Sequence, residues 1–216
     1  MNIAPVFSIL GVLLTILSAT MLIPMLVDIS LGYQNWFGFA SAALISCFVG
    51  ISLWLTNRSK QELNLGLKEA FLLTNSAWVL SGIFGALPFL FSDLGLSFTD
   101  ALFESISGIT TTGSTILTTI ELASPGIILW RALLQWLGGI GIIVMALAIL
   151  PILSIGGMQL FKTETYEASD NAIPRARQLA GGIFGVYASL TLIWTAMLWL
   201  AGMSGFDALI HSMTTL

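Results

Sequence analysis

Charge is scarce in this 216-residue sequence, since only 8% of the residues are Asp, Glu, Lys or Arg, against roughly 25% in soluble domains. Hydrophobic residues make up 56% of the chain. So few charges cannot solvate so much apolar surface, which excludes a water-soluble globular domain and a disordered tail. Seven Lys and Arg stand against eleven Asp and Glu, so no basic surface is present for binding nucleic acid.

Cysteine and histidine are almost missing as well. Cys47 is the single cysteine and His211 the single histidine, which excludes an internal disulfide and a Cys/His zinc site. The sequence contains no Ser/His/Asp set, no paired carboxylates within an apolar stretch and no Gly-rich nucleotide loop after a strand. We therefore expect an integral membrane protein that is not an enzyme and holds no cofactor.

Long apolar runs are what the sequence does contain. A helix needs about 20 apolar residues to cross a hydrocarbon core of about 30 Å. Five stretches are long enough: Ile3–Val27, Trp36–Thr56, Ala70–Ser92, Ile127–Phe161 and Leu179–Phe206. They predict an all-α membrane protein with five transmembrane helices, the first with Pro5 and Pro24 at its two ends, where a missing backbone donor costs least.

The cations indicate how these spans are oriented. Six of the seven lie between spans two and three or between spans four and five: Arg58, Lys60, Lys68, Lys162, Arg175 and Arg177. The positive-inside rule makes both connections, and the N-terminus, cytoplasmic. The acidic residues expected on the opposite side are Asp28, Asp93, Asp100, Glu104, Glu121 and Asp207. They either attract cations to a pore mouth or are simply tolerated there.

The connection 93–126 contains a short apolar segment, Phe98–Ile109, with helical spacing and with Thr99 or Asp100 as the expected N-cap. A 12-residue helix is about 18 Å long, roughly half the hydrocarbon thickness, so it either lies on the surface or enters the membrane and turns back. The small polar residues Thr110–Ser114 that follow favour the second arrangement, because irregular backbone at membrane depth is tolerated where it lines a water-filled path.

This arrangement, a re-entrant pore helix followed by a filter loop, is the geometry in which backbone carbonyls replace the water around a potassium ion. Gly113 can adopt a positive φ, which lets successive carbonyls face one axis. The C-terminal end of the pore helix carries about −0.5 elementary charge and favours a cation. The alternative is that the threonines merely shape a loop.

A weak internal repeat supports a pore unit. A shift of 107 positions places Asp207–Leu216 on Asp100–Ile109 with four of ten residues identical, and places His211 on Glu104. We interpret this as the start of a second pore unit. The given sequence stops at Leu216, the counterpart of Ile109, one residue before the counterpart of Thr110. A filter needs carbonyls from about four loops, so the chain is expected to be a fragment of a longer protein or one of several assembled copies.

The expected organisation has four parts. Residues 1–68 form two leading transmembrane helices and a cytoplasmic loop, and residues 69–161 form the first complete helix–pore loop–helix unit. Residues 162–178 are a cytoplasmic connection, and residues 179–216 start the second unit and stop before its filter.

Two further groups of residues are candidates for supporting roles. Arg131 lies near the outer end of span four and Glu104 on the pore helix; because a buried charge is expensive unless it is paired, we expect an ion pair between them, with interfacial snorkelling of Arg131 as the alternative. Gly138, Gly139 and Gly141 are expected to permit close helix packing behind the filter, or else to form a gating hinge.

The stretch Asp100–Ser114 resembles the first pore loop of the TrkH family, the membrane subunits of bacterial Trk potassium-uptake systems in the Trk/Ktr/HKT superfamily. The stretches Trp130–Ile143 and Ala148–Gln159 are similar to the helix that follows that loop, and the resemblance covers all 216 residues.

The resemblance implies four pore units in one polypeptide, a dimer of such subunits, and gating by a cytoplasmic nucleotide-binding regulatory subunit of the TrkA type. It places the protein in the bacterial plasma (inner) membrane, surrounded by the lipid bilayer. The filter falls on Thr110, Thr111, Thr112 and Gly113, with the carbonyls of Thr111 and Thr112 as the strongest K⁺ ligands.

We therefore expect potassium uptake through a filter of backbone carbonyls, with K⁺ as the transported ion. Two alternatives remain at this point: a homo-oligomeric short cation channel, and a non-transporting membrane scaffold that kept the fold but lost the pore.

Overall fold

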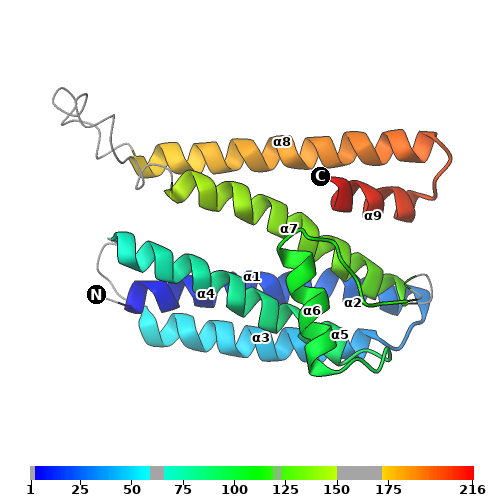
Figure 1. The fold of residues 1–216 in the computed structure, drawn as a ribbon, viewed down its shortest axis with the longest axis horizontal. Coiled ribbons are helices and arrows are strands. Elements are labelled where there is room, and N and C mark those ends of the chain that lie inside the picture. Colours follow the sequence, from blue (N-terminus) through cyan, green and yellow to red (C-terminus); the bar gives the residue numbers. More distant parts are fainter. Residues whose placement is uncertain (1–2, 59–65, 119, 121–122, 150–171) are drawn as a thin grey trace. The chain divides into compact units, whose positions relative to one another are not determined.

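A computed structural model describes residues 3–58, 66–118, 120, 123–149 and 172–216. Within these ranges the repeating elements are all α-helices (Figure 1), in agreement with the predicted fold class: α1 (Ala4–Thr20), α2 (Leu22–Leu31), α3 (Trp36–Asn57), α4 (Leu67–Gly85), α5 (Leu87–Leu90), α6 (Phe98–Ile109), α7 (Pro125–Ile149), α8 (Ala172–Leu200) and α9 (Gly205–Thr215). The chain forms two compact units, residues 1–138 and 139–216, which are described separately.

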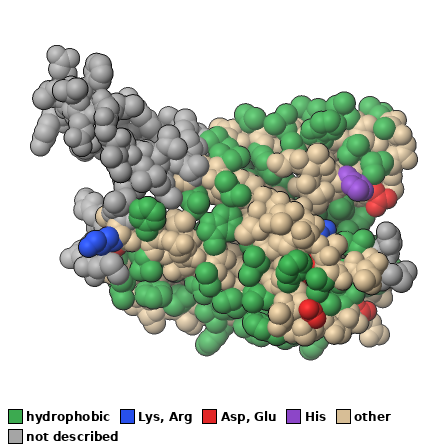
Figure 2. Space-filling model, in the orientation of Figure 1, with side chains coloured by type: hydrophobic (Ala, Val, Ile, Leu, Met, Phe, Trp, Pro, Cys, Tyr) green, Lys and Arg blue, Asp and Glu red, His purple; other side chains and the backbone are tan. Residues whose placement is uncertain are grey.

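The described residues contain five helical stretches long and apolar enough to cross a membrane: Ala4–Leu31, Trp36–Asn57, Lys68–Leu90, Pro125–Ile143 and Gly181–Leu200. They correspond to the five predicted spans, although the predicted continuation of the fourth beyond residue 149 lies outside the described residues. Hydrophobic side chains are spread widely over the face drawn in Figure 2, and charged side chains are few there.

Proline interrupts two of these spans. Pro24 lies inside the first span, not at its end as we expected, and α1 stops at Thr20. Because Pro24 has no N–H to donate to the carbonyl four residues earlier, which is that of Thr20, the chain divides into α1 and α2 at this point. Pro88 has the same relation to Phe84, and α4 ends one residue later, before the short α5.

The first unit is built around the contact between α1 and α3. A Cβ atom on Gly11 would lie 2.6 Å from the carbonyl oxygen of Gly50, and one on Gly50 would lie 2.7 Å from Oγ1 of Thr15. Only residues without side chains allow the two backbones to approach so closely, as is common between membrane helices. The helix α1 packs against α3 and α4, and α6 packs against α4 and α5.

The short helix α6 has the bounds predicted from the sequence, Phe98–Ile109. Its N-cap is Ser97, however, and not Thr99 or Asp100: Ser97 Oγ accepts the N–H of Asp100 at 3.2 Å and donates to Oδ2 of Asp100 at 2.7 Å. Figure 1 shows α6 running across the direction of α1, α3 and α4 rather than alongside them.

The second unit contains the end of α7 together with α8 and α9. The helix α8 begins at Ala172, several residues before the predicted Leu179, and α9 packs against α8. The start of α9 repeats that of α6, because Ser204 caps it through the N–H of Asp207 at 3.1 Å.

Candidate functional site

The segment after α6 folds back onto the end of that helix through its backbone amides. Four successive N–H groups donate to the last carbonyls of the helix: Thr110 to Ile106 (2.9 Å), Thr111 to Gly108 (2.9 Å), and Thr112 and Gly113 to Ser107 (3.0 and 3.2 Å). In a planar trans peptide the carbonyl of one residue points opposite to the N–H of the next. The carbonyls of Thr110, Thr111 and Thr112 therefore point away from the end of α6.

Two residues of this segment have left-handed backbone. Gly113 has φ +76°, the conformation that we expected of it, and Thr111 has φ +58°. A β-branched residue at positive φ is strained, and such strain is concentrated at functional sites. Among the described residues Thr111 is the one non-glycine with positive φ, so the segment 110–113 contains a strained residue.

The carbonyls of the segment fall into two groups. No hydrogen bond within the described part of the chain ends on the carbonyl oxygens of Thr110, Thr111 or Thr112. The next two carbonyls are engaged: that of Gly113 accepts from Arg131 Nη2 at 2.6 Å, and that of Ser114 accepts from Oγ of Ser107 at 2.6 Å. The four predicted ion ligands thus separate into three free carbonyls and one that is already held.

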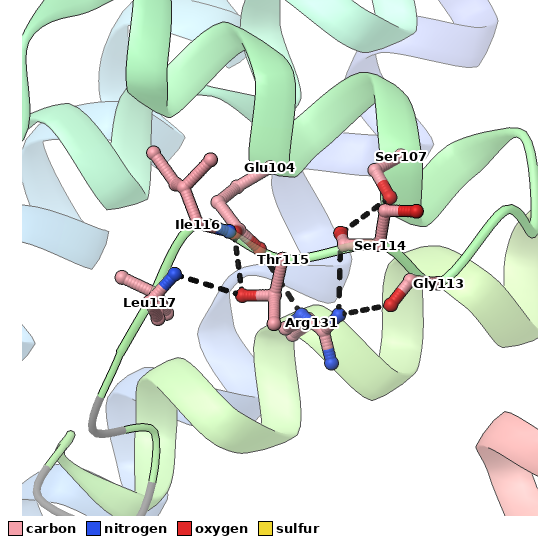
Figure 3. Close-up of polar contacts among 8 residues, drawn as sticks. All are labelled: Glu104, Ser107, Gly113, Ser114, Thr115, Ile116, Leu117 and Arg131. Atoms are coloured by element: carbon pink, nitrogen blue, oxygen red, sulfur yellow. Dashed lines mark hydrogen bonds and ion pairs between the residues drawn. The ribbon is translucent and has the colours of Figure 1, made fainter.

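Glu104 holds the chain that follows residues 110–114 (Figure 3). Its side chain is completely buried. Oε1 accepts from the hydroxyl of Thr115 and from the backbone N–H of Ile116, both at 2.6 Å, and Oε2 accepts from Nε of Arg131 at 3.1 Å. Both carboxylate oxygens are therefore used, as the burial of a charged group requires.

Arg131 connects that carboxylate with the backbone of the segment after α6. The structure brings Arg131 and Glu104 together, with 14% of the arginine side chain exposed. Its Nη2 reaches the carbonyl of Gly113 and, at 3.4 Å, that of Ser114. A guanidinium with fixed donors on two sides can hold both the carboxylate and the loop in one geometry.

The position of Arg131 depends on the packing of α7. The neighbouring Trp130 is fully buried, and its Nε1 donates to the carbonyl of Gly85 at 3.0 Å. Further along, a Cβ on Gly138 would collide with the carbonyl oxygen of Ile109, the last residue of α6. The helix α7 can therefore lie directly against the end of α6 only with glycine at position 138.

The other two candidate glycines lie in the second unit. A Cβ on Gly139 would be 2.6 Å from the hydroxyl oxygen of Tyr187 on α8. Gly141 is partly buried on the same helix, and its role stays a prediction.

Asp28 is a residue whose position the sequence did not reveal. We expected it to belong to an acidic outer surface, but both it and Glu104 have no exposed area. Oδ1 of Asp28 accepts the N–H of Gly126 at 2.7 Å and Oδ2 accepts the hydroxyl of Ser124 at 3.0 Å, both at the start of α7. The one signal in the sequence was a lone carboxylate at the end of an otherwise apolar run.

Of the other acidic residues, Asp93 and Asp207 are exposed and Asp100 is partly buried. Glu121 lies outside the described residues. Among the described residues no group of three or more His, Cys, Asp or Glu side chains is arranged to hold a metal ion. If the segment after α6 binds a cation, its own backbone oxygens are the available ligands.

Comparisons with known proteins show the family to which this chain belongs. The family model of TrkH, described as a cation transport protein, matches residues 37–216. The Trk system potassium uptake protein TrkI of Halomonas elongata is 42% identical over 215 residues, which is 99% of this chain and 43% of that protein. The Trk system potassium uptake protein TrkH of Escherichia coli K12 is 42% identical over 221 residues, covering 100% of this chain and 45% of its own length.

A solved structure is similar over the same range. The crystal structure of the potassium transporter TrkH from Vibrio parahaemolyticus matches 99% of this chain and 42% of that chain, with a TM-score of 0.85 and 38% sequence identity. The chain therefore spans less than half of the length of each of these three relatives. With its five apolar helices it is a multi-pass membrane protein, and it belongs to the TrkH family of cation transport proteins.

Proposed function

We propose that this chain carries the first pore unit of a potassium-uptake protein, and that the backbone carbonyls of Thr110, Thr111 and Thr112 bind K⁺ in place of its hydration water. The curated relatives are named as potassium uptake proteins, and the family is one of cation transport. The activity of a whole transporter requires further carbonyls around the same axis, because a filter is built from several such loops.

The observation that carries this proposal is the backbone of the filter segment. Four amides bonded to the end of α6 turn three successive carbonyls away from it, and those carbonyls have no partner within the described chain. Thr111 and Thr112 remain the strongest candidates, because their carbonyls lie within the stretch of alternating φ. Gly113 contributes through its positive φ, since Arg131 already holds its carbonyl oxygen.

The same proposal gives α6 the role of a re-entrant pore helix. Its 12 residues span about 18 Å, too short to cross the hydrocarbon core, and its C-terminal end carries the partial negative charge beside the three carbonyls. A cytoplasmic N-terminus is consistent with Arg58 at the end of α3, whose guanidinium lies 5.1 Å from the ring centre of Trp54, as an aromatic and a cation do at a membrane interface. The filter would then face the outside.

The ion pair between Glu104 and Arg131 would hold the filter loop in one conformation. Arg131 fixes the carbonyl of Gly113, while Glu104 fixes the hydroxyl of Thr115 and the N–H of Ile116. Gly138 allows α7 to lie directly against the end of α6, and Gly139 allows close approach of the Tyr187 hydroxyl. Gly141 would extend the helix packing of α7. In this arrangement the loop is braced on the side opposite to the ion.

The remaining parts of the transport system are proposed from the family. Further pore units or a second subunit complete the filter, the protein lies in the bacterial plasma (inner) membrane, and a cytoplasmic nucleotide-binding subunit of the TrkA type gates it. The division into residues 1–68, 69–161, 162–178 and 179–216 describes how this chain contributes to that assembly. The relatives' names, which assign them to a Trk system, support this placement.

Gly113→Ala tests the filter assignment, with Gly95→Ala as the matched control. Both glycines have positive φ, +76° and +65°, and a Cβ would meet no atom within 3.4 Å at either position. Each substitution therefore introduces a similar backbone strain of about 1 kcal/mol, but only Gly113 lies in the filter segment.

The measurement is Rb⁺ uptake by a potassium-uptake-deficient bacterium that expresses the product of the complete gene. We expect Gly113→Ala to reduce uptake or its preference for Rb⁺ over Na⁺ at least about tenfold, which is 1.4 kcal/mol, and Gly95→Ala to leave both unchanged. Equal behaviour of the two variants would contradict the assignment.

A further inference from the structure

The burial of Asp28 requires an explanation outside its own helix. It lies in the last turn of α2, where a carboxylate is unfavourably placed with respect to the dipole of that helix. It has no exposed area and no cation as a partner in the described part of the chain. Its contacts with the start of α7 are what stabilise it, because a carboxylate is favourable at a helix N-terminus.

Asp28 completes the hydrogen bonding of the first turn of α7. Pro125 has no N–H, Ile127 donates weakly to Oγ of Ser124 at 3.4 Å, and Ile128 donates to the carbonyl of Ser124 at 3.2 Å. The N–H of Gly126 has no acceptor among these neighbours and is satisfied by Asp28 at 2.7 Å. The fit is tight, since a Cβ on Gly126 would lie 2.5 Å from Cγ of Asp28.

A second contact joins the same part of the leading helices to the other end of the pore connection. Asn35 Nδ2 donates to Oδ1 of Asp93 at 2.7 Å, and the N–H of Asp93 donates to Oδ1 of Asn35 at 3.0 Å. Asp93 precedes α6 and Gly126 follows the filter segment. The end of α2 and the N-cap of α3 thus hold the chain both where it enters the pore connection and where it leaves.

We propose that the two leading helices are a positioning frame for the pore loop, in which Asp28 sets the start of α7 and so the reach of Arg131 to the filter. Arg131 lies five residues after Gly126, about 7.5 Å along the helix. A shift of the helix start moves its guanidinium relative to the carbonyl of Gly113. This inference rests on the proposed function of the filter.

The test compares Rb⁺ and Na⁺ uptake by four variants of the complete gene product: Asp28→Ala, Asp28→Asn, Gly126→Ala and the double variant Asp28→Ala/Gly126→Ala. Ser30→Ala is the matched control, because Ser30 is an exposed polar residue in the same turn of α2. Uptake is expressed per molecule in the membrane, and KM is separated from the maximal rate.

We expect Asp28→Ala to raise KM for Rb⁺ by roughly three- to tenfold and to lower the preference for Rb⁺ over Na⁺. Asp28→Asn keeps an acceptor for Gly126 and stays within about twofold of the wild type. Gly126→Ala behaves as Asp28→Ala does, because the added Cβ displaces the carboxylate. The double variant is no worse than either single one, since removing the carboxylate makes room for the Cβ.

A purely structural role of Asp28 would lower the amount of protein in the membrane and leave KM and ion preference unchanged, and that result overturns the proposal. If Asp28→Ala does not fold, Gly126→Ala decides by the same readout, because its added Cβ displaces the same carboxylate. Unchanged values in Gly126→Ala together with a defective Gly113→Ala refute the positioning role alone. A normal Gly113→Ala refutes the filter assignment instead.

Discussion

The helices α6 and α9 begin in the same way and differ in the middle. Each starts with a serine whose hydroxyl accepts an amide three residues later, at 3.2 Å for Ser97 and 3.1 Å for Ser204. Each serine also donates to the aspartate at that position, at 2.7 Å in both helices. The repeat seen weakly in the sequence is therefore repeated in the local structure of the two helix starts.

The difference lies one turn further along. Glu104 of α6 is completely buried and holds Arg131 and the chain that follows residues 110–114, whereas His211, at the equivalent position of α9, is exposed. The capping hydrogen bonds of such a helix thus depend on its own sequence. The burial of its central residue depends on the elements packed against it. The two positions can be exchanged to test this distinction.

Glu104→His, which places the residue of α9 in α6, should have the largest effect. It removes the carboxylate that pairs with the mostly buried Arg131 and leaves Thr115 and Ile116 without their acceptor. Breaking a buried ion pair from one side costs about 3–5 kcal/mol. Thermal unfolding of the purified protein in detergent would show this loss.

The reciprocal His211→Glu is the control, since an exposed substitution usually changes stability by less than about 0.5 kcal/mol. A large loss in His211→Glu would mean that the two positions are alike after all. In a double-mutant cycle, Arg131→Met combined with Glu104→Gln should be less harmful than the sum of the single changes, and simple additivity would count against the ion pair.

Two glycines of α7 provide the next comparison. A Cβ on Gly138 meets the backbone carbonyl of Ile109, which cannot move without moving α6, whereas a Cβ on Gly139 meets the end of the Tyr187 side chain. We expect Gly138→Ala to cost about 1–3 kcal/mol or more, and Gly139→Ala to cost clearly less, as measured by thermal unfolding. Similar losses for the two variants would argue against close packing of α7 on the end of α6.

The comparison also shows which features a sequence can reveal. The bounds of α6 were predictable because a cap, an apolar face and a short length are local properties, although the capping residue was Ser97 and not Thr99 or Asp100. The break near Pro24 is not predicted by hydropathy, because a long apolar run indicates one continuous helix.

The candidate site also contains one contact that the sequence predicts and one that it does not. Glu104 and Arg131 could be paired from the sequence because each needs a partner in an apolar environment. The contact of Asp28 with Gly126 joins residues 98 positions apart. No periodicity or motif reports such a contact, since it depends on how α2 meets the start of α7.

The two serine caps should respond equally to substitution. Ser97→Ala and Ser204→Ala each remove one acceptor for a first-turn amide, at nearly the same distance. Losing such a cap costs about 0.5–2 kcal/mol, and we expect the two losses in unfolding free energy to agree within about a factor of two. Ser97→Asn and Ser204→Asn, which retain a capping oxygen, should recover most of the loss. Unequal losses would mean that the tertiary surroundings of the two helix starts differ more than their hydrogen bonds do.

The residues after Glu104 and His211 give the smallest expected effect. Ser212 Oγ lies 2.6 Å from Oγ1 of Thr195 on α8, whereas the buried Oγ of Ser105 has no hydrogen-bond partner among the described residues. Ser212→Ala should lower the unfolding free energy by about 0.5–1.5 kcal/mol. Ser105→Ala should be neutral or slightly stabilising, because it removes a buried hydroxyl that lacks a partner. Thermal unfolding of both variants decides the matter, and a destabilising Ser105→Ala would show that this hydroxyl takes part in holding α6 in place.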